Sequence, residues 1–242
     1  MKASKICSVA VVLAAVAMAP PAVAQSGTAV VDARMSTYLA GGNTYSTPPL
    51  GGGGLSPLEI LLNPGTGRVL TFNSITGTAT FCGVSCAAGP DGYASSPGTQ
   101  LSGSGAIGGL AVPGRVAFWT GVFTGPMQPP SQAASAYTDL DFLSLSGMLL
   151  GQQFFIGDGR TSGNVIQQFL IPDNATALYL GFADGFAFAG DPGYYNDNVG
   201  TFSAQYSISS ASTTVPEPST FALAGIGISA LLFMQRRRVT KQ

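Results

Sequence analysis

The sequence contains no histidine, and the stretch from Gln25 to Val215 contains no lysine. Without imidazole or amine groups, this stretch cannot form a serine–histidine–aspartate triad, a Schiff-base lysine or a histidine-containing zinc site. Basic residues are scarce as well, because four arginines stand against ten aspartates and glutamates there, which leaves a net charge of −6. An acidic chain without a basic patch is not expected to bind nucleic acid.

Cysteine is nearly absent too. Cys7 falls in a predicted targeting segment, and only Cys82 and Cys86 remain in the predicted exported part. In an oxidising compartment two cysteines four positions apart are expected to form a local disulfide. A metal pair is the less favoured alternative, because no histidine or further cysteine is left to complete its ligands.

The N-terminus has the pattern of a secretory signal peptide over Met1–Ala24. Lys2 and Lys5 precede an apolar run, and small residues precede a cleavage point between Ala24 and Gln25. This pattern predicts export. The short apolar run and the two prolines that follow it speak against an uncleaved membrane anchor.

Residues 25–208 have almost no long apolar helical pattern and many short apolar or alternating segments between glycine- and proline-rich turns. This pattern predicts one all-β domain, an antiparallel β-sandwich of jelly-roll or lectin-like type. The expected strands are Thr28–Leu39, Leu58–Asn63, Arg68–Ile75, Gly114–Phe123, Gln152–Ile156 and Asn164–Ile171. Ser95–Gly109 is expected to be a surface loop and Gly51–Gly54 a flexible connection, while Leu140–Leu150 fits a short helix or a strand.

The stretch Ala177–Ile208 predicts a strand, a loop and a strand. Residues 200–208 alternate between apolar and polar side chains, which is typical of a half-buried strand. The loop before them is rich in oxygen-bearing side chains, those of Asp184, Asp191, Asn196, Asp197 and Asn198. Carboxylate, amide and carbonyl oxygens are the ligands of a hard cation, above all calcium. The alternative is a polar hairpin loop that uses these residues for turns.

The C-terminal part divides into a polar linker, residues 209–214, and a three-part segment, residues 215–239. This segment contains Pro216, Glu217 and Pro218, then an apolar run over 220–234, then Arg236, Arg237 and Arg238. As a helix the 15-residue run would span about 22 Å, which is short for a hydrocarbon core of about 30 Å. The arginines are expected to stay on the cytoplasmic side, which places the domain on the outer side of the membrane.

This segment resembles the PEP-CTERM sorting signal of exopolysaccharide-producing Gram-negative bacteria. The resemblance implies an inner-membrane intermediate held by the C-terminal helix and processing by an exosortase near the Pro-Glu-Pro motif. The product would be released or transferred to the cell surface or extracellular matrix. The partners it implies are the secretion machinery and the exosortase.

The middle of the chain resembles a second family over a shorter stretch. The run PGYYNDNVGTFS, residues 192–203, is similar to the calcium loop and last strand of the small galactose-binding bacterial lectins, and LNPG at 62–65 is similar to an early part of the same family. The resemblance implies that calcium is bound by the side chains of Asp184, Asp197 and Asn198 and the carbonyls of Tyr194 and Phe81. Asp191 is the alternative to Asp184. Since this sequence lacks the histidine that the family places near its metal, sugar specificity is not carried over.

These observations predict a surface-sorted, non-enzymatic protein with a calcium-stabilised domain that binds exopolysaccharide. Tyr194, Tyr195 and Phe188 could contact a sugar face, although packing explains them equally well. The competing hypothesis is a structural matrix protein that binds no glycan and has at most a structural calcium site. A polysaccharide-cleaving enzyme with Asp139 and Asp141 as acid and base is the least favoured, since two such residues do not define a cleft.

Overall fold

The computed structural model describes residues 24–81, 86–127 and 130–210. These residues belong to one compact unit, residues 22–211. Most of the predicted signal peptide and the whole predicted sorting segment with its helix lie outside the described residues. Within the described ranges no helix is long and apolar enough to cross a membrane.

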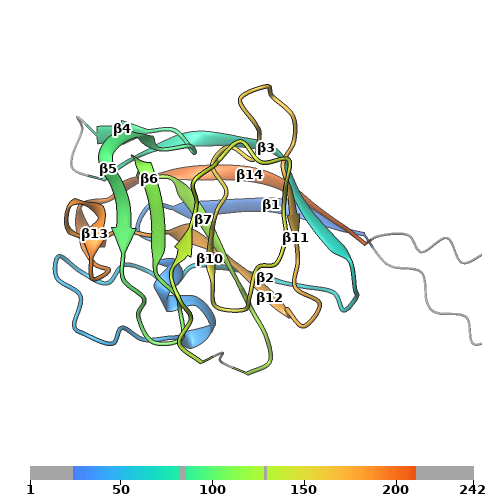
Figure 1. The fold of residues 1–242 in the computed structure, drawn as a ribbon, viewed down its shortest axis with the longest axis horizontal. Coiled ribbons are helices and arrows are strands. Elements are labelled where there is room, and N and C mark those ends of the chain that lie inside the picture. The colour runs from blue at the N-terminus through green and yellow to red at the C-terminus, as the bar shows by residue number, and fades with distance from the viewer. Residues whose placement is uncertain (1–23, 82–85, 128–129, 211–242) are drawn as a thin grey trace, which may run out of the picture. The chain divides into compact units, whose positions relative to one another are not determined.

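The described chain is all-β, as predicted: its regular elements are strands and short 3-10 helices, and its longest strands lie in one sheet (Figure 1). The strand order in this sheet is β1-β14-β3-β11-β9, and β4 pairs with β3. Its strands are β1 (Gln25–Asp32), β3 (Arg68–Thr80), β4 (Ala87–Ala88), β9 (Ser144–Leu145), β11 (Gln168–Leu170) and β14 (Val199–Ser210). The predicted alternation of β14 is confirmed, because Phe202, Ala204 and Ile208 are buried and the polar residues between them are exposed or partly exposed.

Two smaller sheets complete the domain. The second has the order β10-β7-β12-β2 and the third the order β13-β5-β6-β8. The second sheet consists of β2 (Leu58–Leu61), β7 (Trp119–Thr124), β10 (Gln153–Phe155) and β12 (Ala177–Phe182). The third consists of β5 (Tyr93–Leu101), β6 (Leu110–Val116), β8 (Ser135–Ala136) and β13 (Ala189–Gly190). Three short 3-10 helices lie between strands: η1 (Thr37–Gly42), η3 (Phe186–Phe188) and η4 (Tyr195–Asp197).

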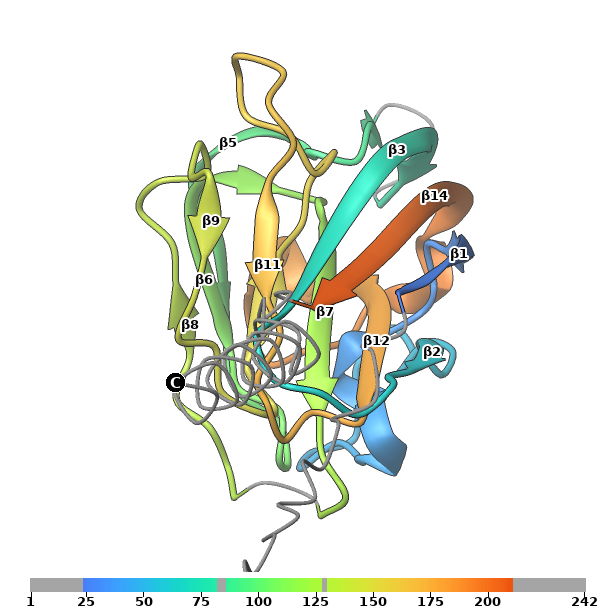
Figure 2. The same cartoon turned by 90° about the vertical axis from the view of Figure 1, so that its right-hand side faces the viewer.

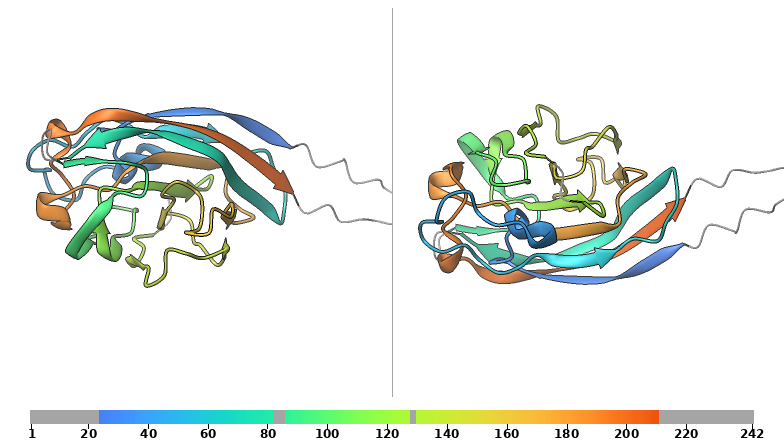
Figure 3. Two further views of the ribbon diagram at one scale, coloured as in Figure 1. Left: turned by 90° about the horizontal axis from the view of Figure 1, so that it is seen from above. Right: turned by 90° about the horizontal axis from the view of Figure 1, so that it is seen from below.

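The layers face each other across an apolar core, which is consistent with a β-sandwich. Seen from above and below, β1, β14 and β3 form one layer, and β7 and β12 lie in another (Figure 3). The larger core cluster includes Leu70, Phe72 and Phe202 from the first sheet and Trp119 and Leu178 from the second. A smaller cluster with Tyr38, Leu110 and Phe118 joins η1 to the third sheet. Burial of these side chains is the main favourable contribution to folding.

Several sequence-based boundaries were wrong. Ser95–Gly109 is not a surface loop, because its first part belongs to β5, which pairs with β6 over a long register. The expected strand Thr28–Leu39 ends at Asp32, and η1 begins at Thr37. The expected strand Gly114–Phe123 is divided at Ala117, which has a φ of 59°, so that β6 and β7 lie in different sheets. Composition could not reveal these divisions, because strand pairing depends on neighbours distant in the sequence.

The expectation of a purely antiparallel domain also needs correction. Most pairs are antiparallel, but β9 with β11, β13 with β5 and β6 with β8 are parallel. Each parallel pair contains a strand of two residues. These strands are short pieces of long connections that run along a sheet edge, where they satisfy backbone groups that would otherwise be unpaired.

The two ends of the described domain lie side by side. Gln25, at the start of β1, pairs with Ile208, near the end of β14 (Figure 2). β13 and the loops around it lie at the other end of the long strands (Figure 1). β14 has twelve residues, which corresponds to about 40 Å at roughly 3.3 Å per residue. The loop that precedes β14 is therefore far from the point where the C-terminal linker begins.

Candidate functional site

The predicted calcium loop brings two polar side chains together from different sheets. Asp184 follows β12 of the second sheet, and Asn198 directly precedes β14 of the first. The Asn198 Nδ2 atom donates to Asp184 Oδ2 at 2.9 Å. Both residues are buried, with exposed fractions of 2% and 1%. The pair therefore connects the ends of the two layers.

The hydrogen bonds of this pair leave one acceptor without a donor. The backbone N–H of Gly185 donates to Asp184 Oδ1 at 2.7 Å, and Asn198 Nδ2 also donates to the carbonyl of Ala33 at 3.2 Å. The Asn198 Oδ1 atom is buried and has no hydrogen-bond partner. Buried polar atoms nearly always have a partner, and an unmatched acceptor costs about 1–3 kcal/mol. A cation bound at this oxygen would remove that cost. To share a cation with the carboxylate, the Asn198 amide would have to turn over, because its nitrogen faces Asp184 in this structure.

The raised pKa of the Asp184 carboxyl is consistent with a binding site for a cation. Burial raises the pKa of this carboxyl to about 7, the hydrogen bonds from Asn198 and Gly185 offset part of the increase, and the nearby charge of Asp197 adds to it. A carboxyl with so high a pKa is poorly compensated by its surroundings. A bound divalent cation would supply the compensation.

The remaining predicted ligands lie near this pair to different degrees. Asp197 is exposed, and its charge acts on Asp184. Phe81 is buried, and its ring packs 5.2 Å from that of Phe182, two residues before Asp184. Asp191, the alternative ligand, is exposed, and its carboxylate accepts a hydrogen bond from Thr47 at 3.4 Å. Its side chain is therefore engaged away from the Asp184–Asn198 pair.

Carboxylates alone do not make a metal centre here. Among the described residues no group of three or more histidine, cysteine, aspartate or glutamate side chains is placed to bind a metal. A cation at this place would depend on Asp184 and Asp197 together with amide and carbonyl oxygens. Such a mixed set is characteristic of calcium.

The glycine run 51–54 is not a flexible connection, and this prediction was wrong. The backbone N–H groups of Tyr194, Tyr195 and Asn196 donate to the carbonyls of residues 50, 52 and 51 at 2.7, 3.2 and 3.1 Å. A Cβ atom on Gly52 would lie 2.2 Å from Asn196 Oδ1, and one on Gly54 would lie 2.4 Å from the carbonyl of Arg34. We call residues 50–54 the strap. The strap contains glycines because the loop around residues 194–196 lies directly against its backbone. The run of four glycines was the feature of the sequence that could have indicated this contact.

The aromatic residues of the loop are placed differently from the prediction. Tyr195 is fully buried, and its hydroxyl donates to the carbonyl of Phe182. Phe188 packs against Phe81 and Tyr93. Tyr195 is therefore not accessible to a sugar, and Phe188 is half-buried. Phe186, which sequence reasoning missed, is 68% exposed, and its ring lies 5.2 Å from that of Tyr194.

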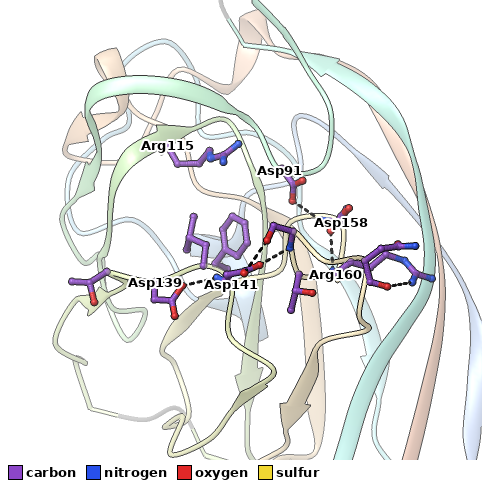
Figure 4. Close-up of a pocket in the computed structure, with 12 residues that line it drawn as sticks. Asp91, Arg115, Asp139, Asp141, Asp158 and Arg160 are labelled. Carbon is purple, nitrogen blue, oxygen red and sulfur yellow. Dashed lines mark hydrogen bonds between the residues drawn. The ribbon is translucent and has the colours of Figure 1, made fainter.

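A pocket of about 550 Å³ lies elsewhere, between the segment around Asp139 and the turn at Asp158 (Figure 4). Its carboxylates are those of Asp91, Asp139, Asp141 and Asp158. Burial and the charge of Asp91 raise the pKa of the Asp158 carboxyl. Asp139 and Asp141, the pair considered for an enzyme, both line this pocket.

Each of these carboxylates accepts a hydrogen bond from a backbone amide. Asp139 accepts from the N–H of Asp141 at 2.8 Å, and Asp141 accepts from both the N–H and the hydroxyl of Ser162. Asp91 accepts from Asp158 at 2.8 Å, and Asp158 accepts from Arg160 at the same distance. These bonds are typical of side chains that stabilise turns.

The predicted disulfide can be described at one end. Cys86 is disulfide-bonded. Its predicted partner, Cys82, lies outside the described residues. Cys86 directly precedes β4, which pairs with β3 at Ala79 and Thr80.

Comparison with known proteins bears on the C-terminal segment. No curated protein matches the chain. No solved structure matches it. The resemblance to the galactose-binding lectins therefore has no support from these comparisons. Residues 214–238 match the profile of the PEP-CTERM protein-sorting motif. The chain carries this motif, as predicted, which implies an exported protein that is processed by an exosortase and localised at the cell surface.

Proposed function

We propose that the exported domain is a lectin-like module in which calcium fixes the loop between Asp184 and Asn198 and which binds exopolysaccharide. The observation that carries the calcium proposal is the buried Asp184–Asn198 pair with its unmatched Asn198 Oδ1 atom. Asn198 also lines a pocket of about 350 Å³ with Asn196, Asp32 and Arg34, and the Arg34 guanidinium is paired with Asp32. Calcium is the favoured ion because the available ligands are oxygens.

Polysaccharide binding is supported by the location of the protein. The sorting motif takes the protein to the cell surface, and the signal that it resembles is that of bacteria that produce exopolysaccharide. We propose an inner-membrane intermediate of a Gram-negative bacterium, held by the helix over 220–234, and a mature form at the cell surface or in the extracellular matrix. Processing would occur near Pro216, Glu217 and Pro218.

The proposed role is not enzymatic. The carboxylates of the 550 Å³ pocket accept hydrogen bonds from backbone amides, which assigns them to turns. A glycosidase would need two carboxyl groups free to face a glycosidic bond. We therefore keep the prediction that the protein is not an enzyme.

The second candidate is a structural matrix protein in which calcium only stabilises the sandwich. It is favoured by the bond from Asn198 Nδ2 to Asp184 Oδ2, because this bond joins the two layers without any ligand. Calcium that raises the melting temperature of a domain that binds no polysaccharide would support this candidate over the first.

Calorimetric titration of residues 25–214 with calcium tests the metal site. We expect one bound ion, and we expect Asp184→Asn to abolish its binding because the substitution removes the buried carboxylate. Asp191→Asn is the matched control and should bind as the unaltered domain does, since that side chain is engaged with Thr47. An unaltered domain that takes up no calcium at millimolar concentration would reduce the loop to a polar hairpin.

A further inference from the structure

A third pocket lies beside the strap. The segments that line it lie at the end of the domain opposite to the chain ends (Figure 1). It has a volume of about 360 Å³ and lies between residues 47–50 and the loop over 186–194. We call it the pole pocket, and the residues that matter are Thr47, Leu50, Phe186, Asp191 and Tyr194. Its size and its mixture of apolar walls with few polar groups are typical of small-ligand sites.

The walls of the pole pocket are exposed aromatic and aliphatic side chains. Phe186 and Leu50 are 68% and 72% exposed. The Phe186 ring is tilted by 44° against the Tyr194 ring at a centroid distance of 5.2 Å. The core does not account for this pair, because Phe188 of the same turn packs inward against Phe81 and Tyr93. Exposed apolar side chains that gather in one pocket mark a binding surface.

The backbone holds these rings in place at an energetic cost. Ala187, Phe188 and Tyr194 have φ values of 51°, 58° and 64°, a conformation that side-chain-bearing residues rarely adopt. They are three of the five non-glycine residues with positive φ in the described ranges. A Cβ atom on Gly51 would lie 2.6 Å from the Tyr194 ring, so the strap fixes that ring from behind. Rings that are fixed before binding lose little entropy when a ligand arrives.

The polar groups of the pole pocket disfavour a negatively charged ligand. Asp191 is the only charged residue among the described residues that line it, and its carboxylate accepts from the Thr47 hydroxyl. A carboxylate and a hydroxyl can bind the hydroxyl groups of a sugar, while the carboxylate repels a uronic acid. The net charge of −6 on the residues between Gln25 and Val215 also repels a negatively charged sugar.

We propose that the pole pocket binds a neutral pyranose unit of a polysaccharide, with the apolar sugar face on Phe186 and Tyr194 and its hydroxyls on Asp191 and Thr47. This inference rests on the proposed polysaccharide binding and names its site and ligand class. The proposed sugar site is separate from the proposed calcium ligands. Asp184 and Asn198 are hydrogen-bonded to each other, whereas the Asp191 carboxylate accepts a hydrogen bond from Thr47. The sugar contacts are made by side chains and do not require coordination to the metal.

The test is calorimetric titration of residues 25–214, the compact unit with the linker, with neutral hexasaccharides of glucose, galactose and mannose and with an oligogalacturonate of the same length. We expect at least one neutral hexasaccharide to bind and the oligogalacturonate not to bind. Phe186→Ala should weaken binding about tenfold or more, as expected for a central aromatic anchor. Asp191→Asn should also weaken it. Both variants should keep the calcium affinity of the unaltered domain.

Leu143→Ala is the matched control, because Leu143 is an exposed apolar side chain outside the pocket. Sugar binding that survives Phe186→Ala and Asp191→Asn but is lost with Asp184→Asn would overturn this inference and leave the proposed polysaccharide function standing. A domain that binds calcium but none of the hexasaccharides would overturn both. A dimer seen by ultracentrifugation that Phe186→Ala dissociates would assign the pole pocket to a second copy of this chain and would likewise overturn the inference.

Discussion

At the scale of single residues, Asp184 is the side chain on which the candidate site depends most. Burial raises its pKa from the ordinary value of 3.8 to about 7. The folded, cation-free domain therefore binds this proton more tightly than the unfolded chain does. Stability from this group is fully present below about pH 4 and is lost as the pH rises to about 7. Above that, both states are ionised and the loss is constant.

We predict that the cation-free domain becomes less stable between pH 4 and pH 7 by up to about 4 kcal/mol from this group, which is the free energy that corresponds to the pKa change. Urea unfolding in the presence of a chelator at a series of pH values measures it. Asp184→Asn should flatten the profile, and calcium should restore stability at pH 7. Equal pH profiles for the variant and the unaltered domain would show that the carboxyl is solvated as in the unfolded chain.

At the scale of elements, the strap and the loop that it supports act as one unit. Three backbone amides of residues 194–196 donate to strap carbonyls, and the 3-10 helix η4 begins in the middle of this contact. The strap comes from the connection between η1 and β2, whereas the loop connects β12 to β14. The geometry of the candidate calcium loop is therefore set by a segment more than a hundred residues earlier in the chain.

We predict that Gly54→Ala destabilises the domain more than Gly42→Ala does. The two glycines have similar φ values of 78° and 75°, but a Cβ atom at Gly54 would lie 2.4 Å from the Arg34 carbonyl, while nothing lies within 4 Å of one at Gly42. Gly42→Ala should cost about 1 kcal/mol from backbone strain alone. Gly54→Ala should cost a further ~1–3 kcal/mol from the clash and weaken calcium binding.

Unfolding midpoints in urea and calcium titrations of both variants test this prediction. The glycine at position 42 serves as the control for backbone strain. Equal losses of stability would mean that the strap moves away from the loop without cost, and the loop would then not be held by it.

At the scale of the whole molecule, the described domain has a hydrophobic core made of its own residues. Both hydrophobic clusters lie within residues 29–208. The pairing of Gln25 with Ile208 closes the domain where the linker begins. The domain is therefore expected to fold after removal of the signal peptide, before or after processing at the C-terminal motif. The loop with Asp184 and the pole pocket lie at the other end of β14, where an extracellular ligand can reach them after export.

We predict that residues 25–214 unfold in one cooperative transition, with a melting temperature within about 2 °C of that of residues 25–242 in detergent. A change of 1 kcal/mol would shift the midpoint of a domain of this size by about 2–4 °C. Calorimetry of both chains measures it, and their calcium affinities should agree as well. Broad, non-cooperative melting of the shorter chain would place part of the core beyond residue 214.

Part of this protein could be predicted from the sequence because the information is local. The sorting motif is a contiguous pattern, and the match over residues 214–238 agrees with its prediction from Pro216, Glu217, Pro218 and the arginines. The all-β class follows from alternation and turn residues, and the buried face of β14 follows from its period of two. The sequence also predicted that Asp184 and Asn198 lie in one loop between two strands, and the structure places both between β12 and β14.

Only the tertiary structure decided how these pieces meet. Asp184 and Asn198 come together because β12 and β14 lie in facing layers, and no local pattern encodes that contact. The exposure of Phe186, the partial burial of Phe188 and the full burial of Tyr195 depend on backbone turns at positive φ that residue type does not favour. The strap was misread as flexible because glycine permits a tight contact as readily as disorder, and only the neighbouring chain distinguishes the two.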